Sequence, residues 1–141
     1  MQLLPSPEYF HLVARPELGV LIGRWQRQPT LEELQAGYQA LLAAAEATAN
    51  RFWLVDARRR DNANQQGTPW MMSVFFPLVA ARLRGPVYMA YVFTPSHLAD
   101  LEADASVPPL TYFDQHPYHV QRFTSEQPAM TWLHACQQLA T

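Results

Sequence analysis

The sequence contains no lysine, so all ten of its basic side chains are arginines. Twelve acidic residues leave a formal net charge of −2, and therefore no general positive charge that would attract nucleic acid or an anionic membrane. Charged residues make up 16% of the chain and hydrophobic residues 49%, a composition typical of a globular protein rather than a disordered one. Each arginine presents a planar guanidinium, which suits carboxylate and phosphate partners.

Cysteine is nearly absent too. Cys136 is the only one, so no disulfide can form within the chain, and we expect a protein of the reducing cytoplasm. Apolar runs stay well below the ~20 residues of a membrane-spanning helix. The opening MQLLPSPEYF lacks the basic segment and apolar core of a signal peptide, so we expect no integral membrane segment. A length of 141 residues fits one domain, 1–141.

Catalytic motifs are also missing. The five glycines are dispersed, so there is no glycine-rich phosphate loop, and there is no Gly-x-Ser-x-Gly turn for a nucleophilic serine. His116 and His119 follow Asp114 and could ligate zinc, but no third or fourth ligand is evident nearby. Pro117 also prevents a helix that would place both rings on one face. We therefore predict a non-enzymatic protein with no metal and no cofactor, and keep a metal-dependent or hydrolase-like activity as an alternative.

Hydrophobic periodicity predicts strands that alternate with helices. The predicted strands are residues 9–15, 20–26, 51–56, 87–93 and 118–123. The predicted helices follow cap residues at Thr30, Thr68, Pro95-Ser96 (helix 97–103) and Ser125. This order, β-β-α-β-α-β-α-β-α, indicates an α/β fold with a mostly parallel five-stranded sheet, packed helices and an antiparallel first strand.

Local signals support these helices. Thr30 and Glu33 have the spacing of a capping box. Thr68 precedes Pro69 and should cap the second helix, since proline is favoured at the first helical position. Pro77 lies inside that helix and should kink it, because proline lacks the backbone N–H and clashes with the preceding turn.

Three longer stretches occur in a characteristic order. They are LIGRWQRQPTLEELQAGYQALL (residues 21–42), FWLVDARR (52–59) and YHVQRFTSEQPAMTWL (118–133). Together with the opening hairpin and the tryptophan-containing helix interrupted by Pro77, they span nearly the whole chain. In this order and spacing the sequence resembles the STAS domain, the fold of sporulation anti-sigma factor antagonists. It resembles more closely the small stand-alone bacterial proteins described as SpoIIAA-like.

The resemblance implies a binding or regulatory module. Antagonist-type members of the family carry a serine, phosphorylated by a partner kinase, at the start of the helix after the third strand. Here no serine follows Asp56, and Thr68 is the only hydroxyl residue at the helix opening, so we do not expect partner switching by phosphorylation. The stand-alone members are related in fold to the CRAL-TRIO lipid carriers, which implies small apolar ligands.

The stretch after the third predicted strand is the candidate binding site. Ligands of open parallel sheets bind beyond the carboxyl ends of the strands, where a following helix also presents unpaired N–H groups. The predicted ligand-binding residues are Asp56, Arg58, Arg59, Arg60, Thr68, Trp70 and Met71. The alternative is a solvated loop in which one arginine pairs with Asp56 or Asp61. In an extended segment side chains alternate in direction, so all three arginines could not face one ligand.

The second predicted helix carries more apolar side chains than one face can hold. Met71, Phe75 and Leu78 share a stripe that should pack on the sheet, whereas Met72 and Phe76 fall on another. The second stripe needs a cover, from a partner subunit, a lipophilic ligand or a neighbouring loop. We prefer a homodimer, through this helix or across a sheet edge, and keep burial against the neighbouring helix as the alternative.

From these observations we predict a STAS-like module that binds a small anionic or lipophilic ligand in the crevice after the third strand. An arginine would hold the anionic group, and Trp70 with Met71 would form an apolar wall. The alternative is a protein–protein regulatory module of the anti-sigma antagonist type that lacks the usual phosphorylatable serine.

Overall fold

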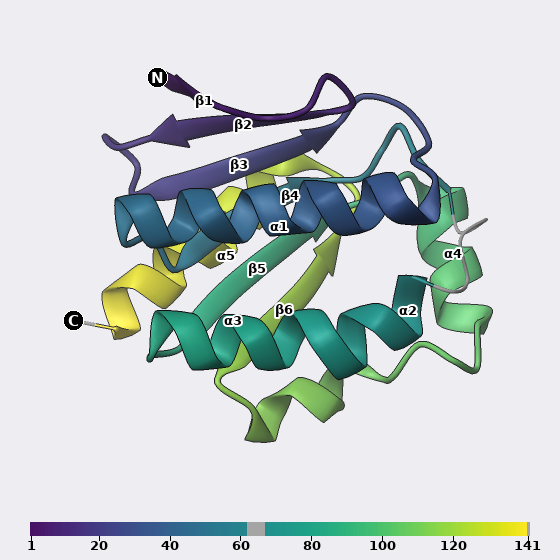
Figure 1. Ribbon diagram of the computed structural model, residues 1–141. Coiled ribbons are helices and arrows are strands. Elements are labelled where there is room, and N and C mark those ends of the chain that lie inside the picture. Colours follow the sequence, from purple (N-terminus) through teal and green to yellow (C-terminus); the bar gives the residue numbers. More distant parts are fainter. Residues whose placement is uncertain (62–66, 141) are drawn as a thin grey trace.

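Six strands form one mixed sheet in the computed structural model, which describes residues 1–61 and 67–140 (Figure 1). The strands follow their order in the chain: β1 (Gln2–Leu4), β2 (Phe10–Arg15), β3 (Val20–Trp25), β4 (Phe52–Asp56), β5 (Val87–Val92) and β6 (Tyr118–Phe123). β2 is antiparallel to both of its neighbours, whereas β3 to β6 are parallel. The predicted α/β class, the mostly parallel sheet and the antiparallel opening hairpin are therefore confirmed.

The predicted number of five strands is wrong by one, because the chain forms a further edge strand, β1. Its three residues pair with residues 12–14 of β2. Leu3 is 75% exposed and only Leu4 packs against the core, so these three residues show no alternation of apolar and polar side chains that the sequence could reveal. Its strand conformation follows from hydrogen bonds to β2, which exist only in the tertiary structure.

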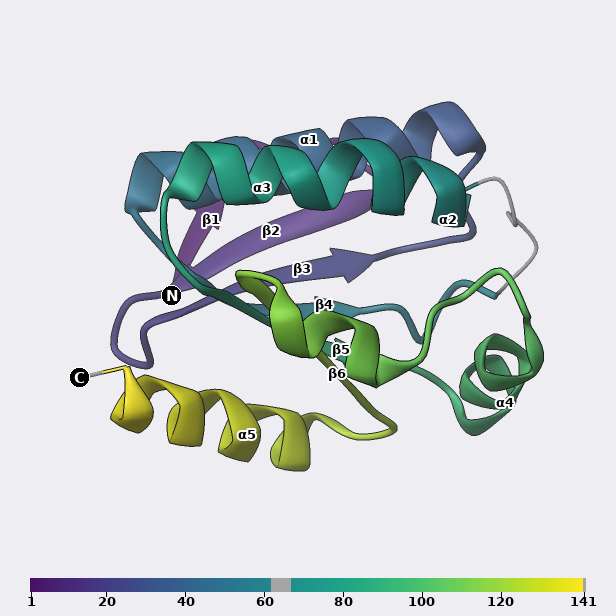
Figure 2. The ribbon, with the colours of Figure 1, turned by 90° about the horizontal axis from the view of Figure 1, so that it is seen from below.

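Helices cover both faces of the sheet (Figure 2). They are α1 (Leu31–Thr48), the run of α2 (Gly67–Trp70), η1 (Met71–Phe75) and α3 (Phe76–Leu83), then α4 (Pro95–Ala103), η2 (Leu110–Gln115) and α5 (Glu126–Leu139). α1 and α3 lie side by side on one face, and α5 lies on the other. α4 stands beyond the carboxyl ends of the parallel strands (Figure 1). None of the described helices has the length and hydrophobicity needed to cross a membrane.

The two faces of the sheet bury two separate cores. The core under α1 and α3 is the larger, and it contains the fully buried rings of Trp25 and Trp53. The smaller core, under α5, includes Leu54 of β4. Because side chains of a strand alternate between faces, Asp56 follows Leu54 onto the α5 side, whereas Tyr91 of β5 belongs to the core under α1 and α3.

Two helix starts differ from the predicted ones. The described chain is already helical at Gly67, so Thr68 lies inside α2 and is not its N-cap. α4 begins with Pro95, and its cap is Thr94, whose hydroxyl accepts a hydrogen bond from the backbone N–H of His97. In both places the predicted boundary is off by one or two residues, because sequence alone ranks neighbouring cap candidates poorly.

Two other helix signals appear in the structure as local geometry. The capping box is confirmed: Thr30 and Glu33 each bond the other's backbone N–H through their side chains. The interruption predicted at Pro77 takes the form of a π-helical turn, η1, in which the N–H of Phe76 donates to the carbonyl of Met71. This wider turn comes directly before a residue that cannot donate to the carbonyl four positions back.

Candidate ligand-binding site

A pocket lies where β5 and β6 end, on the sheet face covered by α1 and α3. Its cavity has a volume of about 110 Å³. Its apolar lining includes Leu34, Met71, Met72, Phe76, Phe93 and Phe113. Its polar lining consists of Tyr38, Arg60, Thr68, Tyr91, His97 and Arg122. Among the residues that the structure describes, no aspartate or glutamate lines it, so the pocket carries positive charge.

Two buried tyrosines contribute adjoining hydroxyls to this pocket. The hydroxyl oxygens of Tyr38 on α1 and Tyr91 on β5 are 2.9 Å apart. Burial raises the pKa of both groups, so both remain protonated at neutral pH. When one hydroxyl donates to the other, the second hydroxyl hydrogen is left with no acceptor in the described part of the chain. The pair therefore has one donor to spare.

Arg60 brings a charge to the pocket from the turn after β4. Its guanidinium carbon lies 5.5 Å from the centre of the Trp25 ring. The Nε of Arg60 and the indole Nε1 of Trp25 are both buried, and neither makes a hydrogen bond of normal geometry among the described residues, although both side chains lie close to the Tyr38 hydroxyl. Buried donors of this kind cost free energy unless an acceptor satisfies them. This part of the pocket has donors in excess of acceptors.

Arg122 supplies a second cation from β6. It lies directly beside Tyr91 in the parallel register and is half-buried, which lowers its guanidinium pKa. Its guanidinium donates a long hydrogen bond, 3.4 Å, to the carbonyl of Pro108. The charge of Glu102 acts on it from a distance, but no ion pair joins it to a carboxylate in residues 1–61 and 67–140. A half-buried cation without a directly bound counter-ion is costly, and a bound anion would offset that cost.

His97, at the start of α4, completes the polar wall. It is 3% exposed, and its Nδ1 has no hydrogen-bond partner within the described chain. Its ring meets the Phe93 ring edge-on, with centroids 4.7 Å apart. Burial, together with the nearby charge of Arg60, lowers the pKa of His97. The imidazole is therefore mainly neutral at pH 7 and adds a polar contact rather than a third positive charge.

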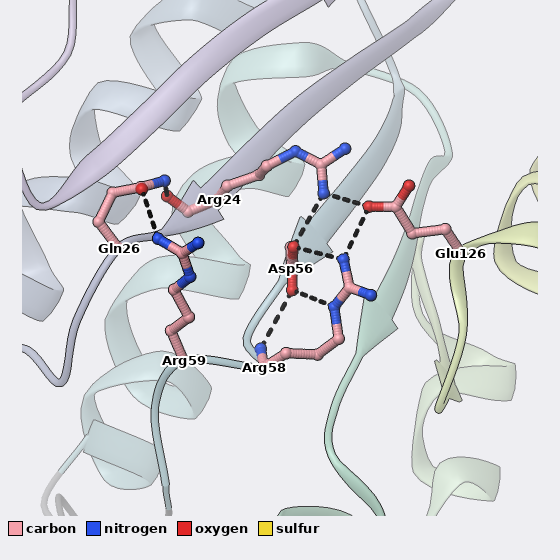
Figure 3. A network of polar contacts seen from close by, with 6 residues as sticks. All are labelled: Arg24, Gln26, Asp56, Arg58, Arg59 and Glu126. Atoms are coloured by element: carbon pink, nitrogen blue, oxygen red, sulfur yellow. Dashed lines mark hydrogen bonds and ion pairs between the residues drawn. The ribbon is translucent and has the colours of Figure 1, made fainter.

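Asp56 and Arg58, both predicted for the ligand site, lie on the opposite face of the sheet in an ion network (Figure 3). Asp56 accepts hydrogen bonds from Arg58 Nε at 2.9 Å and from Arg24 Nη1 at 2.8 Å. Both arginines also contact Glu126 in the first turn of α5. Burial alone would raise the pKa of Asp56, but hydrogen bonds from Arg58 and Arg24 outweigh burial, and the pKa is lowered. The network fastens the start of α5 to the ends of β3 and β4.

The three consecutive arginines thus face three different surroundings. Arg58 pairs with Asp56, as the solvated-loop alternative describes. Arg59 donates to the side chain of Gln26 at 3.1 Å (Figure 3). Arg60 lines the pocket. The three arginines therefore do not share one ligand site. They diverge because residues 57–60 form a turn, and not because side chains alternate along an extended segment.

The remaining predicted residues divide between the pocket and the core. Thr68 and Met71 line the pocket. Trp70 does not; its ring is stacked against Phe75 with centroids 5.7 Å apart, and it packs beside Tyr38. Trp70 therefore supports the pocket from behind instead of forming its wall.

A neighbouring segment of the same chain covers the second apolar stripe of this helix run. Phe76 stacks on Tyr118 of β6 with centroids 5.0 Å apart, and it meets Phe113 of η2 edge-on at 5.6 Å. Met72, from the same stripe, lines the pocket. The neighbouring-loop alternative therefore accounts for Phe76, and the homodimer stays a prediction.

The histidine pair near β6 does not converge. His116 packs against Tyr118 at 5.1 Å, in the core under α3, whereas His119 stacks on Tyr88 at 5.0 Å on the α5 side. In the described ranges, no three His, Cys, Asp or Glu side chains are grouped as a metal ion would require.

Four polar residues of the pocket were not singled out as site residues from the sequence: Tyr38, Tyr91, His97 and Arg122. One of them had a readable signal. In the strand YHVQRF, Arg122 shares its face with Tyr118 and Val120, so a cation stands on an apolar stripe. The tyrosines look like ordinary core residues, because their hydroxyls meet only after α1 packs on β5.

Comparison of the chain with protein-family models, curated proteins and solved structures finds no match. The STAS-like relation therefore stays a prediction based on the residues quoted for it.

Proposed function

We propose that this protein is a binding module that takes a small ligand with an acidic group in the pocket at the ends of β5 and β6. The acidic group meets Arg60 and Arg122, and the apolar part lies against Met71, Met72 and Phe93. The proposal keeps the anionic and lipophilic ligand character expected from the sequence and moves the site from the Asp56 side of the sheet to the opposite face.

One observation carries this proposal: two arginines without a carboxylate partner line the same apolar pocket in the described chain. Arg24 and Arg58 differ in this respect, because both form ion pairs with Asp56 and Glu126. This difference between the two faces supports an anion-binding role for the second face, since a bound anion would supply the counter-charge that Arg60 and Arg122 lack.

The test is an NMR titration of the labelled protein with small organic anions, cations and neutral molecules of similar size. We expect anions alone to shift the backbone signals of Arg60, His97 and Arg122. Shifts that instead centre on Asp56 and Glu126, or shifts of equal size with neutral molecules, would overturn the proposal. Arg82, an exposed residue of α3 that pairs with Glu46, reports non-specific binding of anions to arginine.

We further propose that the fold is related to the STAS-like proteins. The order of elements supports this relation: an antiparallel hairpin opens the domain, and parallel strands connected by helices follow. A regulatory role of the family's protein-binding type would involve the first turn of α2, where Thr68 lies. Incubation with a host extract and ATP, followed by intact mass measurement, tests it: a phosphate on Thr68 would favour the regulatory role over ligand binding.

A further inference from the structure

We infer that the ligand is a small monocarboxylate whose carboxylate group sits among Arg60, Arg122 and the Tyr38–Tyr91 hydroxyl pair and whose short apolar group enters the methionine- and phenylalanine-lined part of the pocket. This inference rests on the proposed function and specifies its ligand.

The partnerless groups around Arg60 and the tyrosine pair are donors, and a carboxylate would supply acceptors for them. The tyrosine pair has one hydroxyl hydrogen to spare, and Arg60 Nε is buried without a hydrogen bond of normal geometry among the described residues. Arg122 stands next to Tyr91 on the neighbouring strand. A carboxylate is an acceptor with two oxygens, which together can take about four hydrogen bonds. It therefore satisfies a guanidinium fork and a hydroxyl at the same time.

The charge of the site favours a monoanion over a phosphate. Two arginines face the pocket, and His97 adds a mainly neutral ring, so the site offers few cations within apolar surroundings. A phosphate group carries close to two charges at neutral pH and three strongly hydrated oxygens. On entering the pocket, a phosphate would lose more hydration free energy than hydrogen bonds from these donors would give back. A carboxylate is planar and matches the geometry of the guanidinium group.

The size and lining of the cavity limit the apolar group. The cavity volume is about 110 Å³, somewhat below the roughly 150 Å³ of a dry apolar cavity that holds benzene. Its apolar wall contains Met71 and Met72, whose unbranched side chains adapt to irregular shapes. A branched or short-chain acid such as isovalerate fits these limits.

The experiment is calorimetric titration of the full chain with four probes: isovalerate, its neutral amide isovaleramide, inorganic phosphate and phenyl phosphate. We expect isovalerate to bind at least tenfold more tightly than the other three. Arg122→Gln and Arg60→Gln should each weaken isovalerate binding by at least tenfold, whereas Arg82→Gln, the same change at an exposed ion pair of α3, should leave it unchanged. Arg122→Lys, which keeps the charge but loses the fork, should give an intermediate affinity.

The four probes distinguish failure of the carboxylate inference from failure of the proposed anion-binding function. If phosphate or phenyl phosphate binds and isovalerate does not, the anion pocket stands and the carboxylate inference falls. If isovaleramide binds as well as isovalerate, or if none of the probes binds, the proposed function falls as well. Circular dichroism of each variant guards against misfolding; should Arg122→Gln not fold, the acid-to-amide ratio in the unaltered protein decides the question by itself.

Discussion

The hydroxyls of Tyr38 and Tyr91 are hydrogen-bonded at 2.9 Å, although 53 positions separate them in the chain. This contact joins α1 to β5 inside the core and sits at the wall of the pocket. The two hydroxyls therefore stabilise the fold through their hydrogen bond and also line the pocket. Substitution of either tyrosine tests both roles.

Tyr38→Phe and Tyr91→Phe should each destabilise the fold by about 1–2 kcal/mol, because each leaves a buried hydroxyl without its partner. The double variant should cost less than the sum of the two, by about 1 kcal/mol, since it removes both polar groups together. Urea unfolding of the four proteins gives this coupling energy. Strictly additive losses would mean that the two hydroxyls do not depend on each other.

Asp56→Asn should destabilise the protein by about 1–3 kcal/mol at pH 7, because the carboxylate holds Arg24 and Arg58 together. The folded-state pKa of Asp56 is lowered below its ordinary value of 3.8, so its contribution to stability is present above that pH and is lost as the pH falls through the folded-state pKa. The gap in unfolding free energy between the two proteins should therefore narrow from pH 7 toward pH 2, as measured by denaturant unfolding. A gap that does not change with pH would contradict the ionic role.

His97 should titrate below its ordinary value of 6.5 in the folded protein, because burial, and then the charge of Arg60, oppose its protonation. Since the folded-state pKa is depressed, the contribution to stability is present above pH 6.5 and is lost as the pH falls through the folded-state pKa. NMR titration of the imidazole signals measures the midpoint of His97 directly. A midpoint at or above 6.5 would contradict the assignment.

Gly37→Ala should destabilise the protein even though alanine is the better helix former by about 1 kcal/mol. A Cβ at this position would lie 2.5 Å from Cη2 of the fully buried Trp25, and overpacking of this kind costs about 1–3 kcal/mol. The exposed neighbour provides the matched control: Ala36→Gly should lose about 1 kcal/mol by propensity alone. Thermal unfolding compares the two. A rise in Tm for Gly37→Ala would show that the Trp25 ring can move aside.

The local and periodic features of the fold could be predicted well from the sequence. The capping box at Thr30 and the strand at residues 118–123 are both confirmed, since each depends on a pattern that a few neighbouring residues determine. Strand β1 could not be predicted in the same way. Its residues are mostly exposed, and only pairing with β2 makes them a strand.

The candidate site was predicted less well, because adjacency in the chain is a poor guide to adjacency across a sheet. Arg58 and Arg60 are two residues apart, yet a turn sends Arg58 to the α5 face and Arg60 to the face under α1 and α3. Conversely, Arg60 and Arg122 come from distant segments and line one pocket. Thr68 and Met71 were predicted from their place after the third strand, and both do line the pocket.

The sequence by itself determined the α/β order, the antiparallel direction of the opening hairpin and the presence of three arginines directly after the third predicted strand, because these depend on local periodicity and residue type. Which arginines keep a carboxylate, and which face apolar surroundings without one, was decided only by the tertiary structure. The physical reason is that the turn over residues 57–60 directs neighbouring arginines to opposite sides of the sheet, where distant segments of the chain supply their surroundings.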